Sequence, residues 1–147
     1  MDDSARLTWH EHEDSVPAEP GLVVDQGLGD ANEAAAPLHE VRPMSCFVHK
    51  ADGHVIGGAV GRRWGRCGEL QQLWVDASQR RQGLGAQLVR RFEDLARRHG
   101  CTQVYLETFS FQAPRFYRAL GYRELAAIDG FAPGIVKFTM LHPLNDA

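Results

Sequence analysis

The chain has 147 residues, of which 44% are hydrophobic and 24% charged, a composition typical of one folded globular domain rather than a disordered or fibrous chain. No apolar run reaches the roughly 20 residues of a membrane-spanning helix, and residues 1–4 are acidic where a signal peptide is basic, so a cytoplasmic protein is expected. The net charge of -3 is divided unevenly, because residues 1–40 carry ten acidic side chains and one basic one, whereas residues 41–147 carry fifteen basic and nine acidic ones.

The first forty residues show the weakest pattern. Ala5–His12 alternates loosely between apolar and polar residues, which predicts a first strand. Residues 15–37 are rich in Gly, Pro, Ala and acidic side chains, so any helix there is expected to be short. The pattern sharpens only at residue 45.

A hairpin is predicted from residue 45 onward. Residues 45–50 form its first strand, Asp52-Gly53 its tight turn, and residues 54–60 its return strand. Glycines weaken the return strand and indicate a bulge or a close backbone contact. These are Gly57, Gly58 and Gly61.

The rest of the chain alternates strands with helices. The next strand covers residues 70–75, and a helix follows whose apolar residues recur every three to four positions: Leu84, Leu88, Phe92 and Leu95. Gly100 ends this helix. Further elements are a strand over residues 102–108, a short helix over 113–120, and two strands around the turns Asp129-Gly130 and Pro133-Gly134. This order predicts an α/β domain built on one mixed sheet.

A basic, glycine-containing loop covers residues 79–85, with the sequence Gln-Arg-Arg-Gln-Gly-Leu-Gly. It joins a strand to the amino terminus of a helix, so that backbone N–H groups and the positive helix end point to one place, which suits a phosphate. The glycine spacing matches neither a nucleotide-hydrolysing P-loop nor a dinucleotide fingerprint. Nucleotide hydrolysis and hydride transfer are therefore disfavoured.

The pattern L-W-V-x-x-x-x-R-x-x-G-x-G, at residues 73–85, resembles the acetyl-coenzyme A loop of the GNAT N-acetyltransferase superfamily. Residues 116–122 are similar to that superfamily's F-Y-x-x-L-G-[FY] helix, and residues 108–114 to the T-F-S-F-Q-A segment of a bacterial subgroup of small acetyltransferases. The resemblance covers about residues 45–141. It implies a GNAT fold, with a single mixed, mostly antiparallel sheet flanked by helices. Residues 1–147 would form one N-acetyltransferase domain, in which residues 1–40 are a variable acceptor-side segment.

The same resemblance implies acetyl-coenzyme A as co-substrate and no metal. Backbone amides of residues 81–86 would hold the pyrophosphate, and the strand at residues 73–75 would pair with the pantetheine arm. Ser110 stands where many relatives have Asn. The implied cofactor-binding residues are Leu73, Trp74, Val75, Arg80, Arg81, Gln82, Gly83, Leu84, Gly85 and Ala86, joined by Ser110, Ala113 and Phe116.

Tyr117 is the candidate general acid. Acyl transfer from a thioester to an amine needs a neutral nucleophile, a stabilised oxyanion and a proton for the departing thiolate. The position of Tyr117 matches the superfamily's tyrosine, and a phenol can protonate a thiolate that is held beside it. The alternative is that Tyr117 is a core aromatic residue beside Phe116.

Glu69 is the candidate general base, at the offset from Val75 seen in the histone-acetylating branch of the superfamily. In a regular strand Glu69, Gln71, Leu73 and Val75 share one face, which would direct the carboxylate toward the acceptor. The alternative is a solvated glutamate at the start of a strand, and Glu107 is a second choice of base. The N–H of Val75 would bind the oxyanion if the sheet opens there.

The acceptor is expected to be a primary amine of a small cationic molecule, such as an aminoglycoside-type antibiotic like kasugamycin. Residues expected to bind it are Glu13, Asp14, Glu33, Glu40 and Gln71. Both charged regions could instead be merely solvated surface. Alternative functions are protein or peptide acetylation, and a non-catalytic module that senses acyl-coenzyme A.

Other partners are not predicted, apart from a homodimer through the carboxyl-terminal strands, which is common in similar proteins. The arginines belong to a loop and helix ends rather than a stripe, which disfavours nucleic acid. The cysteines, Cys46, Cys67 and Cys101, form no C-x-x-C pair and are expected to be buried free thiols. His10 and His12 share a strand face but lack a third ligand, so they predict no metal site, and they could instead line the acceptor pocket.

Overall fold

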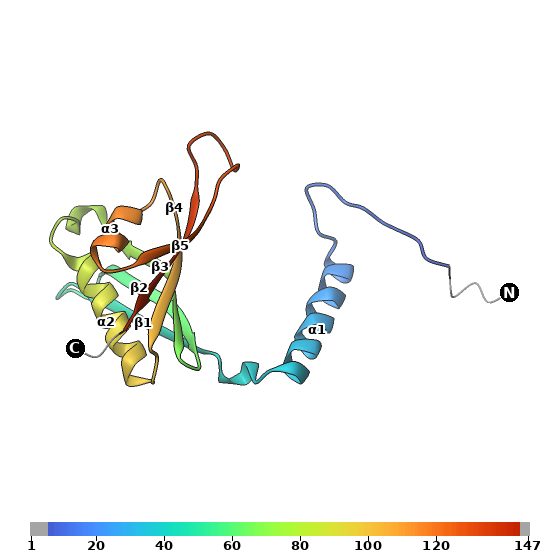
Figure 1. Cartoon of the computed structure of the whole chain (residues 1–147), viewed down its shortest axis with the longest axis horizontal. Coiled ribbons are helices and arrows are strands. Elements are labelled where there is room, and N and C mark those ends of the chain that lie inside the picture. The colour runs from blue at the N-terminus through green and yellow to red at the C-terminus, as the bar shows by residue number, and fades with distance from the viewer. Residues whose placement is uncertain (1–5, 145–147) are drawn as a thin grey trace. The chain divides into compact units, whose positions relative to one another are not determined.

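The structure is a computed structural model that describes residues 6–144 (Figure 1). Residues 1–5 and 145–147 lie outside the described part, and with them the acidic start of the chain and the first residue of the expected strand. The chain divides into two compact units, Met1–His39 and Glu40–Ala147. None of the helices within residues 6–144 has the length and apolar character needed to cross a bilayer.

The first unit holds one helix, α1, which spans Ala18–Ala35 and has no buried residue. The prediction of a short helix at most was therefore wrong. Pro17 is the N-cap and Pro20 lies in the first turn, where backbone N–H groups have no acceptor within the helix, so neither proline interrupts it. The predicted first strand is also absent from the described residues 6–12, which pair with no other segment.

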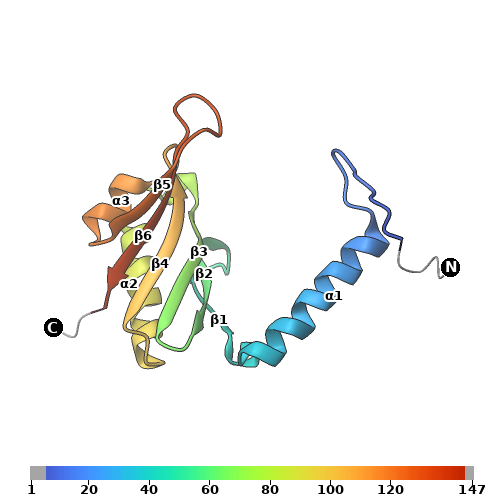
Figure 2. The same cartoon turned by 45° about the vertical axis from the view of Figure 1, so that its right-hand side comes forward.

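The second unit is a six-stranded sheet with strand order β1-β2-β3-β4-β6-β5. Only β3 and β4 pair in parallel, so the predicted mixed, mostly antiparallel sheet is confirmed. Figure 2 shows α2 and α3 on the same side of the sheet. The strands are β1 Arg42–His49, β2 Val55–Trp64, β3 Cys67–Val75, β4 Gln103–Phe109, β5 Arg123–Ile128 and β6 Lys137–Pro143, and the helices are α2 Leu84–Arg98 and α3 Pro114–Ala119, with one-turn 3₁₀ helices at Leu38–Glu40 and Ala77–Gln79.

The core lies between α2 and one face of the sheet. Leu88, Phe92 and Ala96 of α2 are buried there, as their helical spacing predicts. A Cβ atom on Gly61 would lie 1.9 Å from the carbonyl oxygen of Glu69 and 2.8 Å from Cζ of Phe92. The close backbone contact expected of the β2 glycines is therefore confirmed at this position.

A β-bulge interrupts the pairing of β2 with β3. The register passes from Val60↔Gln72 to Gly61↔Leu70, which leaves Gln71 as an extra residue on β3. Leu70 packs in the core before the bulge, and Leu73 packs against the same core after it. Because the extra residue reverses the alternation, Glu69 lies on the opposite face from Leu73, and the prediction that these residues share a face was wrong.

Candidate active site

The strands β3 and β4 part in the middle of the sheet. Their parallel pairing runs only from Cys67↔Gln103 to Leu70↔Leu106, although β4 continues beside β6 as far as Phe109. A cavity of about 280 Å³ opens where they part. Its lining residues are Leu70, Gln71, Gln72, Leu73, Glu107, Thr108, Gln112, Ala113 and Tyr117.

Two backbone amides of β3 point into this opening. The N–H of Asp76 donates to the carbonyl oxygen of Ile56 at 2.8 Å, which makes Gly57 and Val75 a non-hydrogen-bonded antiparallel pair. The N–H and C=O groups of Val75 therefore point away from β2, and those of Leu73 do so by the same alternation. Because β4 has already diverged, the N–H groups of Leu73 and Val75 and the C=O group of Leu73 are available to an extended ligand.

The loop after β3 presents further free amides. Arg80 anchors the loop, with its Nε donating to the carbonyl oxygen of Val75 at 3.1 Å. Arg81 and Gly83 both adopt left-handed conformations, with φ of 66° and 75°. The first intrahelical bond of α2 runs from the N–H of Gln87 to the oxygen of Gly83, so the amides of residues 84–86 have no acceptor within the helix.

This helix start fits a phosphate group. The first turn of α2 carries no acidic side chain, and its free N–H groups lie at the positive end of the helix dipole. A Cβ atom on Gly85 would lie 3.3 Å from Cζ of Phe116, so the bare glycine is what allows α3 to pack against this turn. Loop and helix together present several backbone donors to one phosphate-sized site.

Leu73 and Ala113 are the expected cofactor residues that line the cavity, and two others, Ser110 and Trp74, use their polar groups within the protein. Ser110 uses its hydroxyl within the protein, where it donates to the carbonyl oxygen of Gly134 and accepts from the N–H of Val136, both at 3.0 Å. Trp74 pairs with Gly58 and directs its backbone toward β2, because it alternates with Val75. Both residues lie beside the opening without contributing a free polar group to it.

Tyr117 combines a buried ring with an accessible hydroxyl. The residue is 8% exposed, and burial raises the pKa of its phenol to about 12. Its hydroxyl makes no hydrogen bond to another described residue, yet no fully buried side-chain oxygen in the described part of the chain lacks a partner. The hydroxyl therefore opens to the cavity that Tyr117 lines. The ring packs in the core, as the core-aromatic interpretation expects, and the proton-donor role of the hydroxyl stays a prediction.

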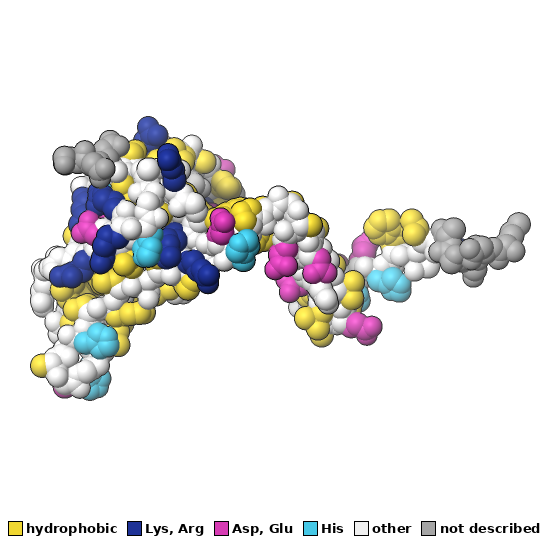
Figure 3. Space-filling model, turned by 90° about the horizontal axis from the view of Figure 1, so that it is seen from below, with side chains coloured by type: hydrophobic (Ala, Val, Ile, Leu, Met, Phe, Trp, Pro, Cys, Tyr) yellow, Lys and Arg dark blue, Asp and Glu magenta, His cyan; other side chains and the backbone are white. Residues whose placement is uncertain are grey.

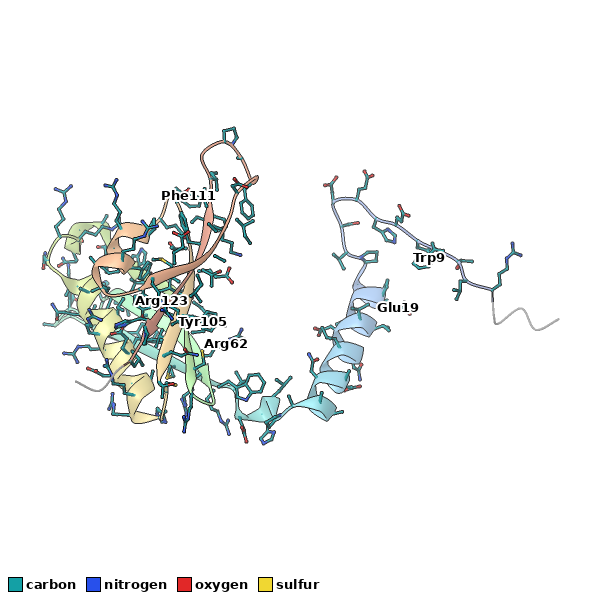
Figure 4. All side chains as sticks on the ribbon, viewed as in Figure 1. Trp9, Glu19, Arg62, Tyr105, Phe111 and Arg123 are labelled. Carbon is teal, nitrogen blue, oxygen red and sulfur yellow. The ribbon has the colours of Figure 1, made fainter. Side chains whose placement is uncertain are left out.

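Glu69 is held by two neighbouring strands. Its side chain is 17% exposed and accepts a hydrogen bond from Nε of Arg62 on β2 at 3.0 Å. The hydroxyl of Tyr105 on β4 donates to the second carboxylate oxygen at 2.6 Å. Burial and, after it, this bond raise the pKa of Tyr105 to about 12. Arg62 and Tyr105 are labelled in Figure 4. The interpretation of Glu69 as a freely solvated glutamate was therefore wrong.

Glu69 and Tyr117 line two different cavities beside the separated strands. A second cavity, of about 180 Å³, is lined by Glu69, Leu70, Gln71 and Glu107. It shares the last three residues with the cavity that Tyr117 lines, but it lies on the sheet face turned away from α2. Two reactants could therefore meet between β3 and β4 from the two sides of the sheet.

Some residues of the site were missed by the sequence analysis. Arg62 could have been found, because the two-residue turn after Trp64 sets Arg62 opposite Glu69. Tyr105 could not, because it depends on the parallel pairing of β3 with β4. Gln112 accepts a hydrogen bond from the N–H of Phe109 at 2.7 Å and so shapes the cavity wall.

The acidic residues expected to bind the acceptor fall in different places. Glu13, Asp14 and Glu33 belong to the unit Met1–His39, whereas Glu40 ends the 3₁₀ helix at Leu38–Glu40. Of the five expected acceptor-binding residues, only Gln71 lines the cavities. Figure 3 shows acidic side chains along α1 and basic side chains over the second unit. A role for the acidic residues in acceptor binding stays a prediction.

The expected thiols and histidines form no metal site among residues 6–144, where no three His, Cys, Asp or Glu side chains cluster in a suitable way. The three cysteines are free, as expected. Cys101 is buried, whereas Cys46 and Cys67 are only partly buried. His10 and His12 are exposed.

The model of the acetyltransferase (GNAT) family matches residues 6–122. The chain belongs to this family. The match runs through the loop at residues 79–85, the parted strands β3 and β4, and the helix that carries Tyr117. The activity that the family shares, N-acetyl transfer, is therefore the activity of this chain.

Individual GNAT relatives agree with this assignment. Blasticidin-S acetyltransferase of Streptomyces morookaense is 38% identical over 112 residues, which cover 74% of this chain and 82% of the relative. An acetyltransferase of Agrobacterium fabrum is 26% identical and is covered over 88% of its length. The crystal structure of a Bacillus cereus acetyltransferase superposes with a TM-score of 0.77 at 28% identity, covering 91% of this chain and 98% of the other. The GNAT fold is thereby confirmed.

Proposed function

We propose that this GNAT protein transfers the acetyl group of acetyl-coenzyme A to a primary amine of a small cationic antibiotic. The observation that carries the proposal is the separation of β3 from β4 beyond Leu70 and Leu106. It leaves free backbone amides beside two adjoining cavities, one lined by the phenol of Tyr117 and the other by the carboxylate of Glu69. Acetyl-coenzyme A and the acceptor amine can then meet between β3 and β4.

Backbone N–H and C=O groups provide most of the contacts to acetyl-coenzyme A. The free amides of residues 84–86, with the left-handed Arg81 and Gly83, hold the pyrophosphate. The N–H and C=O groups of Leu73 pair with the pantetheine amides as a neighbouring strand would, which leaves the N–H of Val75 for the oxyanion. Phe116 fixes α3 against this loop through Gly85, so cofactor binding and the catalytic helix share one support.

Two side chains, Glu69 and Tyr117, carry out the two proton transfers of the reaction. An alkyl amine with a pKa of about 10.4 is protonated at neutral pH and must lose a proton before it attacks. Glu69 takes that proton, directly or through a water, because its carboxylate borders the second cavity. As the C–N bond forms, the N–H of Val75 stabilises the oxyanion, and Tyr117 donates its proton to sulfur as the C–S bond breaks. The raised pKa keeps Tyr117 protonated at neutral pH.

The acceptor side favours a cation. Glu69 and Glu107 are the two charged residues that line the second cavity. Glu69 pairs with Arg62 at 3.0 Å and Glu107 with Lys137 at 2.6 Å, and the lone pairs that these bonds leave free suit an ammonium group. The similarity to a blasticidin-S acetyltransferase supports an antibiotic as the acceptor. Blasticidin S is therefore the first acceptor to test, with kasugamycin, an aminoglycoside-type antibiotic, as the second.

The test is a thiol-release assay with acetyl-coenzyme A and a panel of amines. The panel contains blasticidin S, kasugamycin, simple diamines and peptides, and the Tyr117→Phe variant is the matched control. We expect turnover with a cationic antibiotic that this variant nearly abolishes. Turnover with peptides alone would show a protein acetyltransferase. Tight binding of acetyl-coenzyme A without turnover of any amine would show a sensing module.

A further inference from the structure

A buried carboxylate lies behind the site and outside the cavities described above. Glu93 is on α2, and its side chain is fully buried. It accepts hydrogen bonds from Nη1 of Arg90 at 2.8 Å, from the hydroxyl of Tyr122 at 2.9 Å and from Nδ1 of His142 at 2.9 Å. Because a buried carboxylate is stable only when it is paired and hydrogen-bonded, these three donors are fixed around it.

The donors join three parts of the fold. Arg90 belongs to α2, Tyr122 follows α3, and His142 lies on β6. Burial, and after it the charge of Glu93, raises the pKa of Tyr122, so its hydroxyl remains a donor. Glu93 therefore attaches the segment that follows α3 to the middle of α2.

Tyr122 in turn holds Tyr117. Its ring packs edge-on against the ring of Tyr117, with centroids 5.7 Å apart and an interplanar angle of 71°. Its backbone N–H also donates to the carbonyl oxygen of Tyr117 at 3.0 Å. The position of the Tyr122 ring therefore limits where the ring and hydroxyl of Tyr117 can lie.

A second aromatic ring, that of Phe116, also packs against Tyr117. Phe116 packs edge-on against it, with centroids 5.1 Å apart, and itself packs against the first turn of α2 at Gly85. Tyr117 therefore contacts two rings, each held by α2: Phe116 packs against Gly85, and the hydroxyl of Tyr122 bonds to Glu93. The anchors, Gly85 and Glu93, are about 12 Å apart along the helix axis.

We propose that Glu93 is a positioning residue for acetyl transfer. By fixing the hydroxyl of Tyr122, it holds the Tyr122 ring against Tyr117 and keeps the hydroxyl of Tyr117 at the cavity. The inference rests on the proposed function, in which Tyr117 supplies the proton to the departing sulfur.

The kinetic test uses Glu93→Gln and Tyr122→Phe, which keep side-chain shape and remove the charge or the hydroxyl. We expect each to lower kcat about tenfold and to change the KM for acetyl-coenzyme A less than about twofold. Asp94→Asn is the matched control, because Asp94 is also a helix carboxylate paired with an arginine, Arg97 at 2.8 Å, but touches neither tyrosine. Its kcat should equal that of the wild type.

The decisive comparison repeats Glu93→Gln in a Tyr117→Phe background. If Glu93 acts through Tyr117, adding Glu93→Gln to the Tyr117→Phe variant causes no further loss of kcat. An equal loss in both backgrounds would overturn the proposal. Should Glu93→Gln fail to fold by circular dichroism, Tyr122→Phe, which removes a single hydrogen bond, takes its place in the comparison.

A spectroscopic test separates this proposal from the proposed function. The chain has three tyrosines, so ¹³C labelling of tyrosine gives few signals, and substitutions assign them. The ring signal of Tyr117 should shift in Glu93→Gln and in Tyr122→Phe, and stay fixed in Asp94→Asn. An unchanged Tyr117 signal overturns the proposal. Full turnover in Tyr117→Phe would instead refute the proton-donor role and leave the shift intact.

Discussion

Arg62 and Glu69 face each other across β2 and β3, with the Nε–H of Arg62 donating to a carboxylate oxygen of Glu69 at 3.0 Å. The bond holds the carboxylate on the sheet face turned away from α2, beside the second cavity. Tyr105 occupies the other carboxylate oxygen. The candidate base is thus fixed in position before an acceptor arrives, which lowers the entropic cost of placing it beside the ammonium group.

Glu69→Gln should lower the rate most at low pH. Below a pH of about 10 the acceptor amine is protonated, and the amide of glutamine cannot take its proton. Raising the pH supplies neutral amine and should partly restore the rate. The measurement is kcat/KM for the acceptor against pH, with Glu107→Gln measured alongside. If kcat/KM of Glu69→Gln follows the wild-type pH dependence, and the loss of rate at low pH is found in Glu107→Gln instead, then Glu107 is the base.

Tyr117→Phe should reduce kcat by about 10²- to 10⁴-fold while the affinity for acetyl-coenzyme A is nearly unchanged. The substitution keeps the aromatic packing and removes the proton. Stopped assays for turnover and calorimetry for cofactor binding measure the two quantities separately. Wild-type turnover would show that Tyr117 serves the core alone.

The pH dependence of wild-type turnover should also report on Tyr117. Its pKa is raised to about 12, so its proton is retained below that value and lost only as the pH rises through it. The Tyr117 hydroxyl should therefore cause no fall in rate near pH 10, where an ordinary phenol ionises. A spectrophotometric titration of Tyr117 near pH 10 in the folded protein would contradict this expectation.

Gly83→Val should weaken binding of coenzyme A by about 100-fold or more, because the new side chain occupies space in front of the free amides. Gly53→Val is the matched control. Both glycines have positive φ, 75° and 93°, and in both an added Cβ meets no atom within 4 Å. The backbone cost is therefore shared, and calorimetry should find the affinity loss in Gly83→Val alone. Equal affinities would remove this loop from the cofactor site.

The acidic residues of the first unit should contribute to acceptor binding through long-range attraction. Exposed charges are screened beyond about 10 Å at 0.1 M salt, so the KM for a polycationic acceptor should rise with ionic strength. Neutralising Glu13, Asp14 and Glu33 together should raise it at low salt and flatten its salt dependence. A neutral amine measured in parallel is the control. Unchanged KM values in the triple variant would leave these charges as solvated surface.

The parts of the fold that the sequence predicted correctly have local signals. The turn Asp52-Gly53 and the periodic apolar face of α2 both lie within one element or between neighbours. Helix α1 was missed because its glycines and prolines were counted without regard to position, and Pro17 and Pro20 stand where proline is tolerated.

The candidate site was predictable where its residues follow one another in sequence. The loop 79–85 could be interpreted as a phosphate site because strand, glycines and helix start are consecutive. The bond from Tyr105 to Glu69 joins residues 36 positions apart through a parallel pairing that no local pattern reveals. The extra residue Gln71 was equally hidden, because an insertion in one strand is defined only by the partner that lacks it.

Because of the bulge at Gln71, the alternation of side chains in residues 67–70 of β3 does not continue into residues 73–75. Under the proposed function, residues 67–70 would direct side chains toward the acceptor, whereas Leu73 and Val75 would present main-chain groups to the cofactor, and the extra residue decouples the orientations of the two segments. Substitutions in the first half can therefore alter which amine is accepted while the second half continues to bind the same acyl donor. One inserted residue thus lets side-chain changes in the first half of this strand leave the orientation of the second half unaltered.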